Sequence, residues 1–542
     1  MKKNLIYLFI VLFSFSACEN FLEEEIKSNV VAEDYYATSA GYQSLVHATY
    51  SSLREYLGQH PWLFISGTDL YTEGRDPAPI GLSRYTNLNS NSEGVDFLYI
   101  NCYKSIQLAN NAVYYGDITE QTADVDRLVG EAKFIRALSY FYLVQTYGGV
   151  SLIDMPVTEA ITKIDRNTEE EIYAFIIQDL EDARNRVKNG AFEGMVTRRA
   201  VVDLLAKVHL TRGYQSYGAS DDFQKAAQYA DEAIEGQGLN LSFAELWTPG
   251  NEMNEEVLFS VQFSQASIST NPSELGNRMQ NFFGPYLGGS EVAGDNPYKM
   301  ASTSPSLYAM ELFEEGDSRY EVTFMTKIYD RYYDFYDVDV ADHPTLDVSH
   351  FYAPKWFTPA DSTAFRAAHP EAFYHSFYDS NPDTGDSNLD FSTISIKKFD
   401  DPKSLYAAGN SRTSSRDVII SRLAETYLIA AEAYLQAGQA QTGLDRLNTV
   451  RKRAGAVEAS LAEFDINYIL DERGRELLGE YKRWFDLKRT GTLVKRASQY
   501  NRLVEESNFV GNGGELKILR PIPQAALDLN QSDQFKQNPA YQ

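Results

Sequence analysis

Cysteine is scarce in this sequence, with two in 542 residues, and basic residues are outnumbered by acidic ones. So little cysteine excludes a disulfide framework and a zinc site built on thiolates. The 49 Lys and Arg residues face 76 Asp and Glu residues, which gives a net charge of −27. Nucleic-acid binding depends on neutralising phosphates with Lys and Arg, so this balance argues against a nucleic-acid partner.

Recognisable catalytic and metal-binding motifs are also missing. The sequence contains no phosphate loop, zincin helix, nucleophile elbow or dinucleotide fingerprint. Five aspartates lack the glycine and terminal glutamate of an EF-hand, so we interpret them as a solvated loop, with calcium as the alternative: Asp334, Asp337, Asp339, Asp342 and Asp347. Four histidines without paired ligand spacing are interpreted as scattered loop residues: His343, His350, His369 and His375. We expect no metal, no cofactor and no enzymatic activity.

The one long apolar run lies at the start of the chain. Two lysines precede Leu5–Phe13, and small residues follow before Cys18. This pattern predicts a signal peptide over 1–17, too short to span a bilayer as a lasting helix. Cys18 stands where a bacterial lipobox places its lipid-accepting cysteine, although Phe15 replaces the usual Leu. We expect acylation (palmitate) at Cys18, with a plain signal peptide and an incidental cysteine as the alternative.

An acidic segment follows the predicted anchor. Residues 18–34 are interpreted as a lipidated tether, and Glu23-Glu24-Glu25 lies inside it. Acidic residues in this place resemble the surface-export signal of some Gram-negative lipoproteins. A merely solvated tether is the alternative.

Hydrophobic periodicity divides the rest of the chain into three regions. Apolar residues recur at helical three- and four-residue steps in several segments: 42–56, 97–115, 124–147, 168–187, 197–213, 222–236, 416–452 and 464–490. Residues 58–94 have the composition of a long functional loop. We predict a helical region over 35–236, an irregular insertion with short strands such as 257–263 over 237–415, and a helical C-terminal region over 416–542.

Small residues within the helical segments suggest a repeat. One set has the spacing of a tetratricopeptide-like helix–turn–helix unit: Tyr427, Ala430, Ala431, Tyr434, Gly438, Gly443, Leu447 and Val450. Looser copies begin at Ala137 and Leu205. We therefore predict a mostly α-helical scaffold of tetratricopeptide-like repeats with a large loop-rich insertion. Ordinary αα-hairpins without superhelical stacking are the alternative.

Ordered motifs along nearly the whole chain carry a family resemblance. They are Gly130–Ala137, Tyr147–Val150, Glu171–Leu180, Leu204–Val208, Arg422–Ile429, Leu447–Arg451, Arg483–Arg489, Pro521–Pro523 and Gln537–Pro539. In this order they resemble the SusD/RagB family of outer-membrane nutrient-binding lipoproteins. Tyr481 departs from a frequent Gly and Arg520 from a commoner aliphatic residue, and we interpret both as local packing variants.

The resemblance implies a location, a partner and an activity. It implies a SusD-like fold, lipid-anchored on the cell-surface side of the outer membrane, in polysaccharide utilisation. A SusC-like TonB-dependent transporter would receive the oligosaccharide that the protein captures. The alternatives are binding of peptides or other nutrients within the same family, a surface glycoside hydrolase, which would need two carboxylates roughly 5–10 Å apart, and a tetratricopeptide adaptor that binds peptide tails.

Charged residues of the C-terminal motifs are interpreted as structural. Glu476, Glu480, Arg483 and Asp486 follow three- and four-residue steps, which predicts one helix with a solvated, salt-bridged face. A basic cluster is expected to balance nearby acids rather than to bind anions: Arg451, Lys452, Arg453, Lys488, Arg489, Lys495 and Arg496.

Sugar binding needs an aromatic face for the pyranose ring and polar groups for its hydroxyls. Two regions offer that mixture, the early loop and the insertion. The candidate ligand-binding residues are Asp69, Arg75 and Tyr85 first, followed by Trp62, Tyr71, Tyr286 and Trp356. For each aromatic residue, the alternative interpretation is that it packs in the hydrophobic core and does not contact the ligand.

Overall fold

The structure is a computed structural model that describes residues 32–75, 77–270, 276–285, 301–330, 339–378, 393–402, 405–407 and 411–542. Several residues named above lie outside these ranges: Cys18, Tyr286, Asp334 and Asp337. The signal peptide, the lipidation site and a ligand contact by Tyr286 therefore stay predictions. Among the described residues, no helix combines the length and apolar character needed to cross a bilayer.

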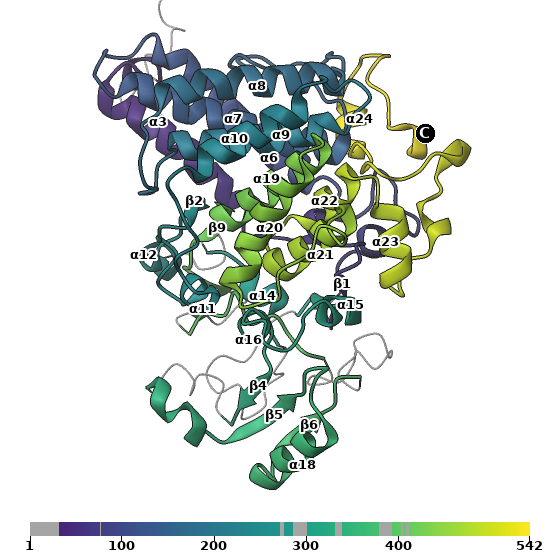
Figure 1. Cartoon of the computed structure of the whole chain (residues 1–542). Helices are drawn as coiled ribbons and strands as arrows, with labels where there is room; N and C mark the ends of the chain where they lie inside the picture. Colours follow the sequence, from purple (N-terminus) through teal and green to yellow (C-terminus); the bar gives the residue numbers. More distant parts are fainter. Residues whose placement is uncertain are drawn as a thin grey trace, which may run out of the picture.

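The long helices of the N-terminal half are α3 (Ser39–Ser52), α6 (Phe97–Gly116), α7 (Val125–Tyr147), α8 (Glu169–Arg186), α9 (Arg198–Gly213) and α10 (Asp222–Ile234). Consecutive helices pack in pairs, α6 on α7, α7 on α8 and α9 on α10, in the upper part of Figure 1. Local sequence fixes their ends. Thr168 and Glu171 form a capping box at the start of α8, and Gly148, with φ of +76°, ends α7.

The C-terminal helices are α19 (Leu423–Gln436), α20 (Ala440–Arg453), α21 (Ile466–Leu477), α22 (Arg483–Arg489) and α23 (Leu493–Tyr500). At Gly443 of α20 a Cβ atom would lie 2.6 Å from the carbonyl oxygen of Ala431 in α19, so only glycine allows this close approach. Gly438, with φ of +78°, makes the turn between the two helices. The predicted helix–turn–helix unit is confirmed at these positions.

Helix α10 joins the two helical regions. Its buried residues Ala226, Ala227 and Ala230 pack in one cluster with residues of α9 and of α19, including Leu210 and Ile429. Small side chains let neighbouring helices come close together, as stacked helical repeats require. The predicted mostly α-helical scaffold is confirmed, and it includes helices far apart in the sequence.

Short elements fill the rest: α2 (Ala32–Tyr36), α4 (Trp62–Ile65), α5 (Ile80–Arg84), α11 (Phe243–Trp247), α12 (Gln265–Thr270), α14 (Met279–Phe283), α15 (Leu307–Glu311), α16 (Tyr320–Thr323) and α24 (Gln524–Leu529). Strand β1 (Tyr71–Glu73) pairs with β3 (Thr303–Pro305), and β2 (Val257–Val261) pairs with β9 (Val418–Arg422), both antiparallel. Strand β7 (Leu405–Ala407) pairs with β8 (Ser411–Thr413). The β2–β9 pair ties the first part of the insertion to the start of the C-terminal region.

A small layered unit lies at the bottom of Figure 1, away from the paired helices. Strands β4 (Lys327–Tyr329), β5 (Val348–Tyr352) and β6 (Phe373–His375) form its sheet, and Phe365 of α18 (Pro359–Ala368) stacks on Phe351 of β5. His350 and His375 stand on neighbouring strands with ring nitrogens 3.0 Å apart. The interpretation of these two histidines as scattered loop residues was therefore wrong, since strand pairing brings them together.

The first part of the early segment 58–94 is buried in the core, and exposed residues appear only from Arg75 onward. Leu63, Phe64 and Ile65 of α4 are at most 1% exposed and belong to the main core. Phe64 stacks on Tyr481 with ring centroids 4.6 Å apart. Glycine, proline and asparagine interrupt the periodicity here because the chain turns often, and residues 61–72 do so inside the molecule.

Candidate functional site

The charged residues of the C-terminal motifs lie in the interior. Glu472, Glu476, Glu480, Arg483 and Asp486 are each at most 4% exposed. Helix α21 ends at Leu477 and α22 begins at Arg483, so these residues do not share one helix. The prediction of a solvated, salt-bridged face was wrong. The three- and four-residue steps between these charged residues instead belong to a buried ion-pair network.

Glu476 is the centre of that network. Its carboxylate lies 2.7 Å from Arg422 Nη1 and 3.0 Å from Arg319 Nη1, and it also pairs with Arg453. Arg319 continues to Glu472 at 2.8 Å, and Arg422 continues to Glu480 at 2.7 Å. The network therefore ties α21 to β9, α20 and the insertion through charged hydrogen bonds.

The arginines of the basic cluster also form ion pairs with acids of the fold. Arg451 pairs with Glu472, Arg453 with Glu476, Arg489 with Glu432 and Asp486, and Arg496 with Asp69 and Asp471. The prediction that these arginines balance nearby acids is confirmed. Acids within the fold already hold their guanidinium groups.

Burial and charge act in opposite directions on the carboxyl groups of the network. Burial alone would raise the pKa of Glu472, but Arg319, Arg475 and Arg451 outweigh it and lower the pKa to about 2. Glu476 follows the same pattern, since Arg453, Arg422 and Arg319 hold its pKa well below the ordinary value.

These lowered pKa values predict acid sensitivity. A carboxyl group with a lower pKa in the folded state adds stability above its unfolded pKa, about 4.3 for Glu, and loses it as the pH falls towards the folded value. We therefore expect the urea midpoint of unfolding to stay level from pH 7 to 5 and to fall steeply between about pH 4.5 and 2. Urea titrations at constant ionic strength would measure it. A urea midpoint that stays level down to pH 3 would show that the network does not stabilise the folded state in this way.

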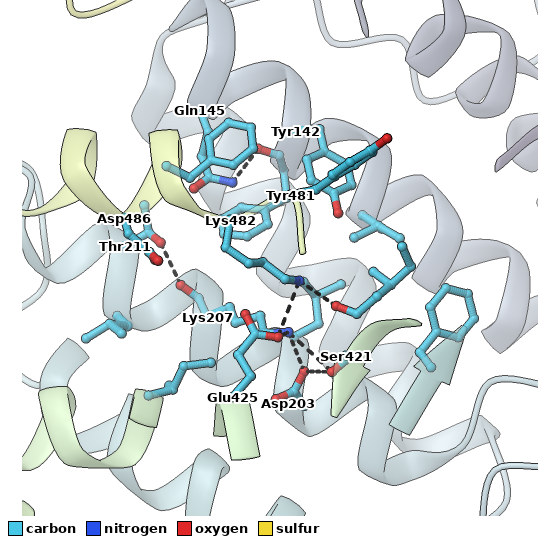
Figure 2. Close-up of a pocket in the computed structure, with 18 of the residues that line it drawn as sticks. Tyr142, Gln145, Asp203, Lys207, Thr211, Ser421, Glu425, Tyr481, Lys482 and Asp486 are labelled. Atoms are coloured by element: carbon cyan, nitrogen blue, oxygen red, sulfur yellow. Dashed lines mark hydrogen bonds and ion pairs between the residues drawn. The ribbon is translucent and has the colours of Figure 1, made fainter. Parts of the chain in front are cut away.

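A second group of buried charges surrounds an interior cavity between α7, α9, α19 and α22 (Figure 2). Lys207 lies 2.9 Å from Asp203 and 2.8 Å from Glu425, and Lys482 lies 3.3 Å from Glu425. Burial alone would raise the pKa of Glu425, but Lys207, Lys482 and Arg473 outweigh it and lower it strongly. The polar side of the cavity is thus paired charge, and Phe134, Phe259 and Phe485 line other parts of it.

The size of this cavity decides what it can hold. It offers about 60 Å³ to water-sized molecules, whereas small-molecule sites usually enclose roughly 300–1,000 Å³. A water needs about 10–15 Å³ of such space, so a few waters fit and a sugar ring does not. We assign the cavity to the scaffold.

Asp69, one of the three leading candidates for ligand binding, lies fully buried in the structure. Its Oδ1 and Oδ2 accept hydrogen bonds from Arg483 at 2.7 and 2.6 Å, and Arg496 Nε donates to Oδ2 at 2.8 Å. Burial raises the pKa of Asp69, and the two arginines outweigh it, so the pKa is lowered. In this geometry Asp69 joins α22 and α23 to the early segment, and a ligand contact by it stays a prediction.

Three predicted aromatic residues also lie in or at the core. Tyr85 is fully buried and its hydroxyl lies 3.1 Å from Trp484 Nε1, while the Tyr71 hydroxyl accepts the backbone N–H of Gly479. Trp62 is 9% exposed, and its ring lies 6.1 Å from that of Phe282 in the insertion. The structure thus brings the two predicted regions into contact at Trp62, through packing.

Arg75 and Trp356 remain nearer the surface. Arg75 is exposed just after β1. Trp356 is half-buried, with its ring 4.9 Å from that of Tyr320. Of the candidates that the structure describes, Arg75 is exposed, Trp356 is half-buried, and the remaining four are at most 9% exposed.

An ion pair beside Arg75 was missed by the sequence reasoning. Glu73 accepts hydrogen bonds from Ser83 Oγ at 2.6 Å and from Arg84 Nε at 2.8 Å, and the Arg84 side chain is 37% exposed. Glu73 ends β1, which pairs with Thr303 of the insertion. The available signal in the sequence was an acid directly before Gly74-Arg75, with Ser83 and Arg84 ten and eleven positions after it.

Comparisons with known proteins agree with this architecture. A model of the SusD family matches residues 219–541, and a second family model, described as starch-binding associating with outer membrane, matches residues 76–210. "SusD-like protein P2" of Formosa agariphila is 27% identical over all of this chain and all of its own length. "Starch-binding protein SusD" of Bacteroides thetaiotaomicron is 24% identical over 83% of this chain and 79% of its own length.

Solved structures share the fold. A structure titled "Laminarin binding SusD-like protein" superposes with a TM-score of 0.70 at 23% identity, covering 93% of this chain and all of its own. Surface glycan-binding protein A from Bacteroides thetaiotaomicron, in complex with laminarihexaose, superposes with a TM-score of 0.67 at 18% identity over the same shares. These proteins therefore share the fold of this chain.

Proposed function

The chain belongs to the SusD family, and on that premise we propose that it is a lipid-anchored surface protein that captures oligosaccharides and passes them to a SusC-like TonB-dependent transporter. In this proposal Cys18 carries the lipid anchor and the folded part lies outside the outer membrane. The protein binds the glycan and does not cleave it. The transporter supplies the energy for uptake, and this chain acts as the lid that opens and closes over it.

The observation that carries the proposal is the polar edge where the early segment meets the insertion. There β1 and β3 pair, Arg75 is exposed, and Glu73 holds Arg84. Carboxylate and guanidinium groups side by side suit the neighbouring hydroxyls of a sugar, which both donate and accept hydrogen bonds. We propose this edge as part of the capture surface, with Trp356 as a candidate platform for a sugar ring.

The scaffold supports a binding role. The buried ion pairs and the core leave the frame rigid, so binding residues at its edge are held in place before ligand arrives. Among the described residues, the strongly perturbed carboxyl groups of the network are held by arginines inside the fold. Laminarin and starch, which two relatives are named for, are the first ligands to test.

The Arg75→Ala variant is expected to weaken glycan binding about tenfold, because a hydrogen bond from a charged donor contributes roughly 1.5–3 kcal/mol. Calorimetric titration of residues 18–542 with laminarin and starch oligosaccharides would measure it. Lys452→Ala is the matched control, since that side chain is 62% exposed in a separate ion pair with Glu458, and its affinity should equal the wild type.

Three results would contradict the proposal. Release of shorter sugars during the titration would favour a glycoside hydrolase. Saturable binding of peptides without any glycan binding would show that the ligand is a peptide and not a glycan. An equal loss of glycan affinity in Arg75→Ala and Lys452→Ala would show that Arg75 has no specific role in the capture surface.

A further inference from the structure

A second pocket opens on the N-terminal half, built by elements other than the β1–β3 edge. It lies between α3, α7, the segment before α9 and strand β2, and it offers about 350 Å³. That volume falls in the range of small-molecule sites. The residues that matter for its chemistry are Tyr50, Arg54, Glu131, Glu193, Ser260 and Gln262.

Arg54 supplies the positive charge of this pocket. Its Nε donates to the backbone oxygen of Gln262 at 2.6 Å, and its guanidinium lies 5.6 Å from the centroid of the Phe263 ring. These contacts fix the side chain, while its two terminal Nη groups make no hydrogen bond to any residue that the structure describes. Burial lowers the pKa of Arg54, and Asp417 only partly offsets that effect. A held guanidinium with a free fork is suited to bidentate binding of a carboxylate.

The acidic groups in the pocket lining restrict which anions the pocket can bind. Glu131 is buried and paired with Arg127, and Glu193 is exposed. Glu131 and Glu193 in the lining, together with Asp417, which acts on Arg54, repel a dianion such as phosphate more strongly than a ligand with a single carboxylate.

Neutral polar groups complete the lining. Ser260 is 3% exposed, and its Oγ has no hydrogen-bond partner within the described part of the chain. A buried hydroxyl without a partner costs free energy that a ligand hydroxyl would recover. The side-chain amide of Gln262 and the carboxylate of Glu193 offer further partners for hydroxyl groups.

We infer that this pocket binds a small sugar acid, such as a hexuronic acid, with its carboxylate on Arg54 and its hydroxyl groups on Ser260, Gln262 and Glu193. The site is separate from the proposed capture surface and adds an acidic sugar to the ligands of the protein. One unit of the sugar acid fits within a pocket of this size.

Calorimetric titration of residues 18–542 with glucuronate, glucose, inorganic phosphate and glutamate tests the inference. Glucuronate is expected to bind at least tenfold more tightly than each of the other three. Arg54→Gln should weaken glucuronate binding at least tenfold, and Lys452→Ala, on a distant surface ion pair, should leave it unchanged. Glucuronate and oligosaccharide binding are measured in separate titrations, so the failure of one proposal does not decide the other.

A steric variant keeps the test informative if Arg54→Gln does not fold. Ser51 is exposed on α3 and lines the pocket, so Ser51→Phe should block glucuronate without disturbing the core. Ser44→Phe, also exposed on α3 but outside the lining, is its matched control and should bind normally. Equal affinity for glucuronate and glucose, tighter binding of phosphate or glutamate, or unchanged affinity in Ser51→Phe would overturn the inference.

Discussion

Glu476→Gln is expected to lower the free energy of unfolding by about 3–5 kcal/mol, or to prevent folding at ordinary temperature. The glutamine keeps the shape of the side chain and removes its charge. Arg319, Arg422 and Arg453 then face a neutral group in the interior, where their own charges remain. Removing one member of a buried ion-pair network costs more than the pair contributes, because the partner charges stay buried.

Urea unfolding followed by circular dichroism would measure this loss. Glu458→Gln is the control, because Glu458 and its partner Lys452 are each more than half exposed and such surface pairs contribute little. The control should change the unfolding free energy by less than about 0.5 kcal/mol. A loss below about 1 kcal/mol in Glu476→Gln would show that the network does not hold the scaffold.

Asp69→Asn is expected to cost a similar 3–5 kcal/mol while leaving glycan affinity unchanged in the folded protein. Asp69 is fully buried between Arg483 and Arg496, so the substitution breaks a bridge between the early segment and two C-terminal helices. Thermal unfolding and calorimetric titration of the same preparation would separate stability from binding.

The opposite pattern would restore the role that the sequence alone suggested. If Asp69→Asn kept its stability and lost glycan affinity tenfold, Asp69 would belong to the capture surface. Asp221→Asn provides the control, since Asp221 pairs with Lys225 on the surface and both side chains are at least 41% exposed.

Helices were predictable from the sequence because their signals are local. Apolar periodicity and end signals lie within each segment, as in the capping box of Thr168 and Glu171 at the start of α8. The same local view misplaced the charged motif around Glu476. Steps of three and four residues describe a helix face without saying whether solvent or protein covers it, and the partner Arg319 lies 153 positions before Glu472.

The candidate site was harder to predict for a related reason. Polar and aromatic residues in a Gly- and Asn-rich segment have the composition of a sugar site, and also of a core that turns often. Arg483, the partner of Asp69, is 414 positions away, and nothing local signals that pair. Arg75 was selected by the same reasoning and lies at the surface, so composition alone did not separate the two.

Tyr481 shows what one departure from a family pattern can mean. Its backbone has φ of +57°, a conformation that favours glycine. The ring compensates by stacking on Phe64, and the hydroxyl donates to the backbone oxygen of Gln59. The sequence indicated a packing variant at this position, and the structure supplies the contacts that allow it.

The most direct test of glycan capture without cleavage is to saturate residues 18–542 with an oligosaccharide while heat is recorded, then release the ligand and analyse it by chromatography. We expect a saturable isotherm and an oligosaccharide recovered at its original length. Shortened products, or no saturable heat with any oligosaccharide of a broad panel, would contradict it.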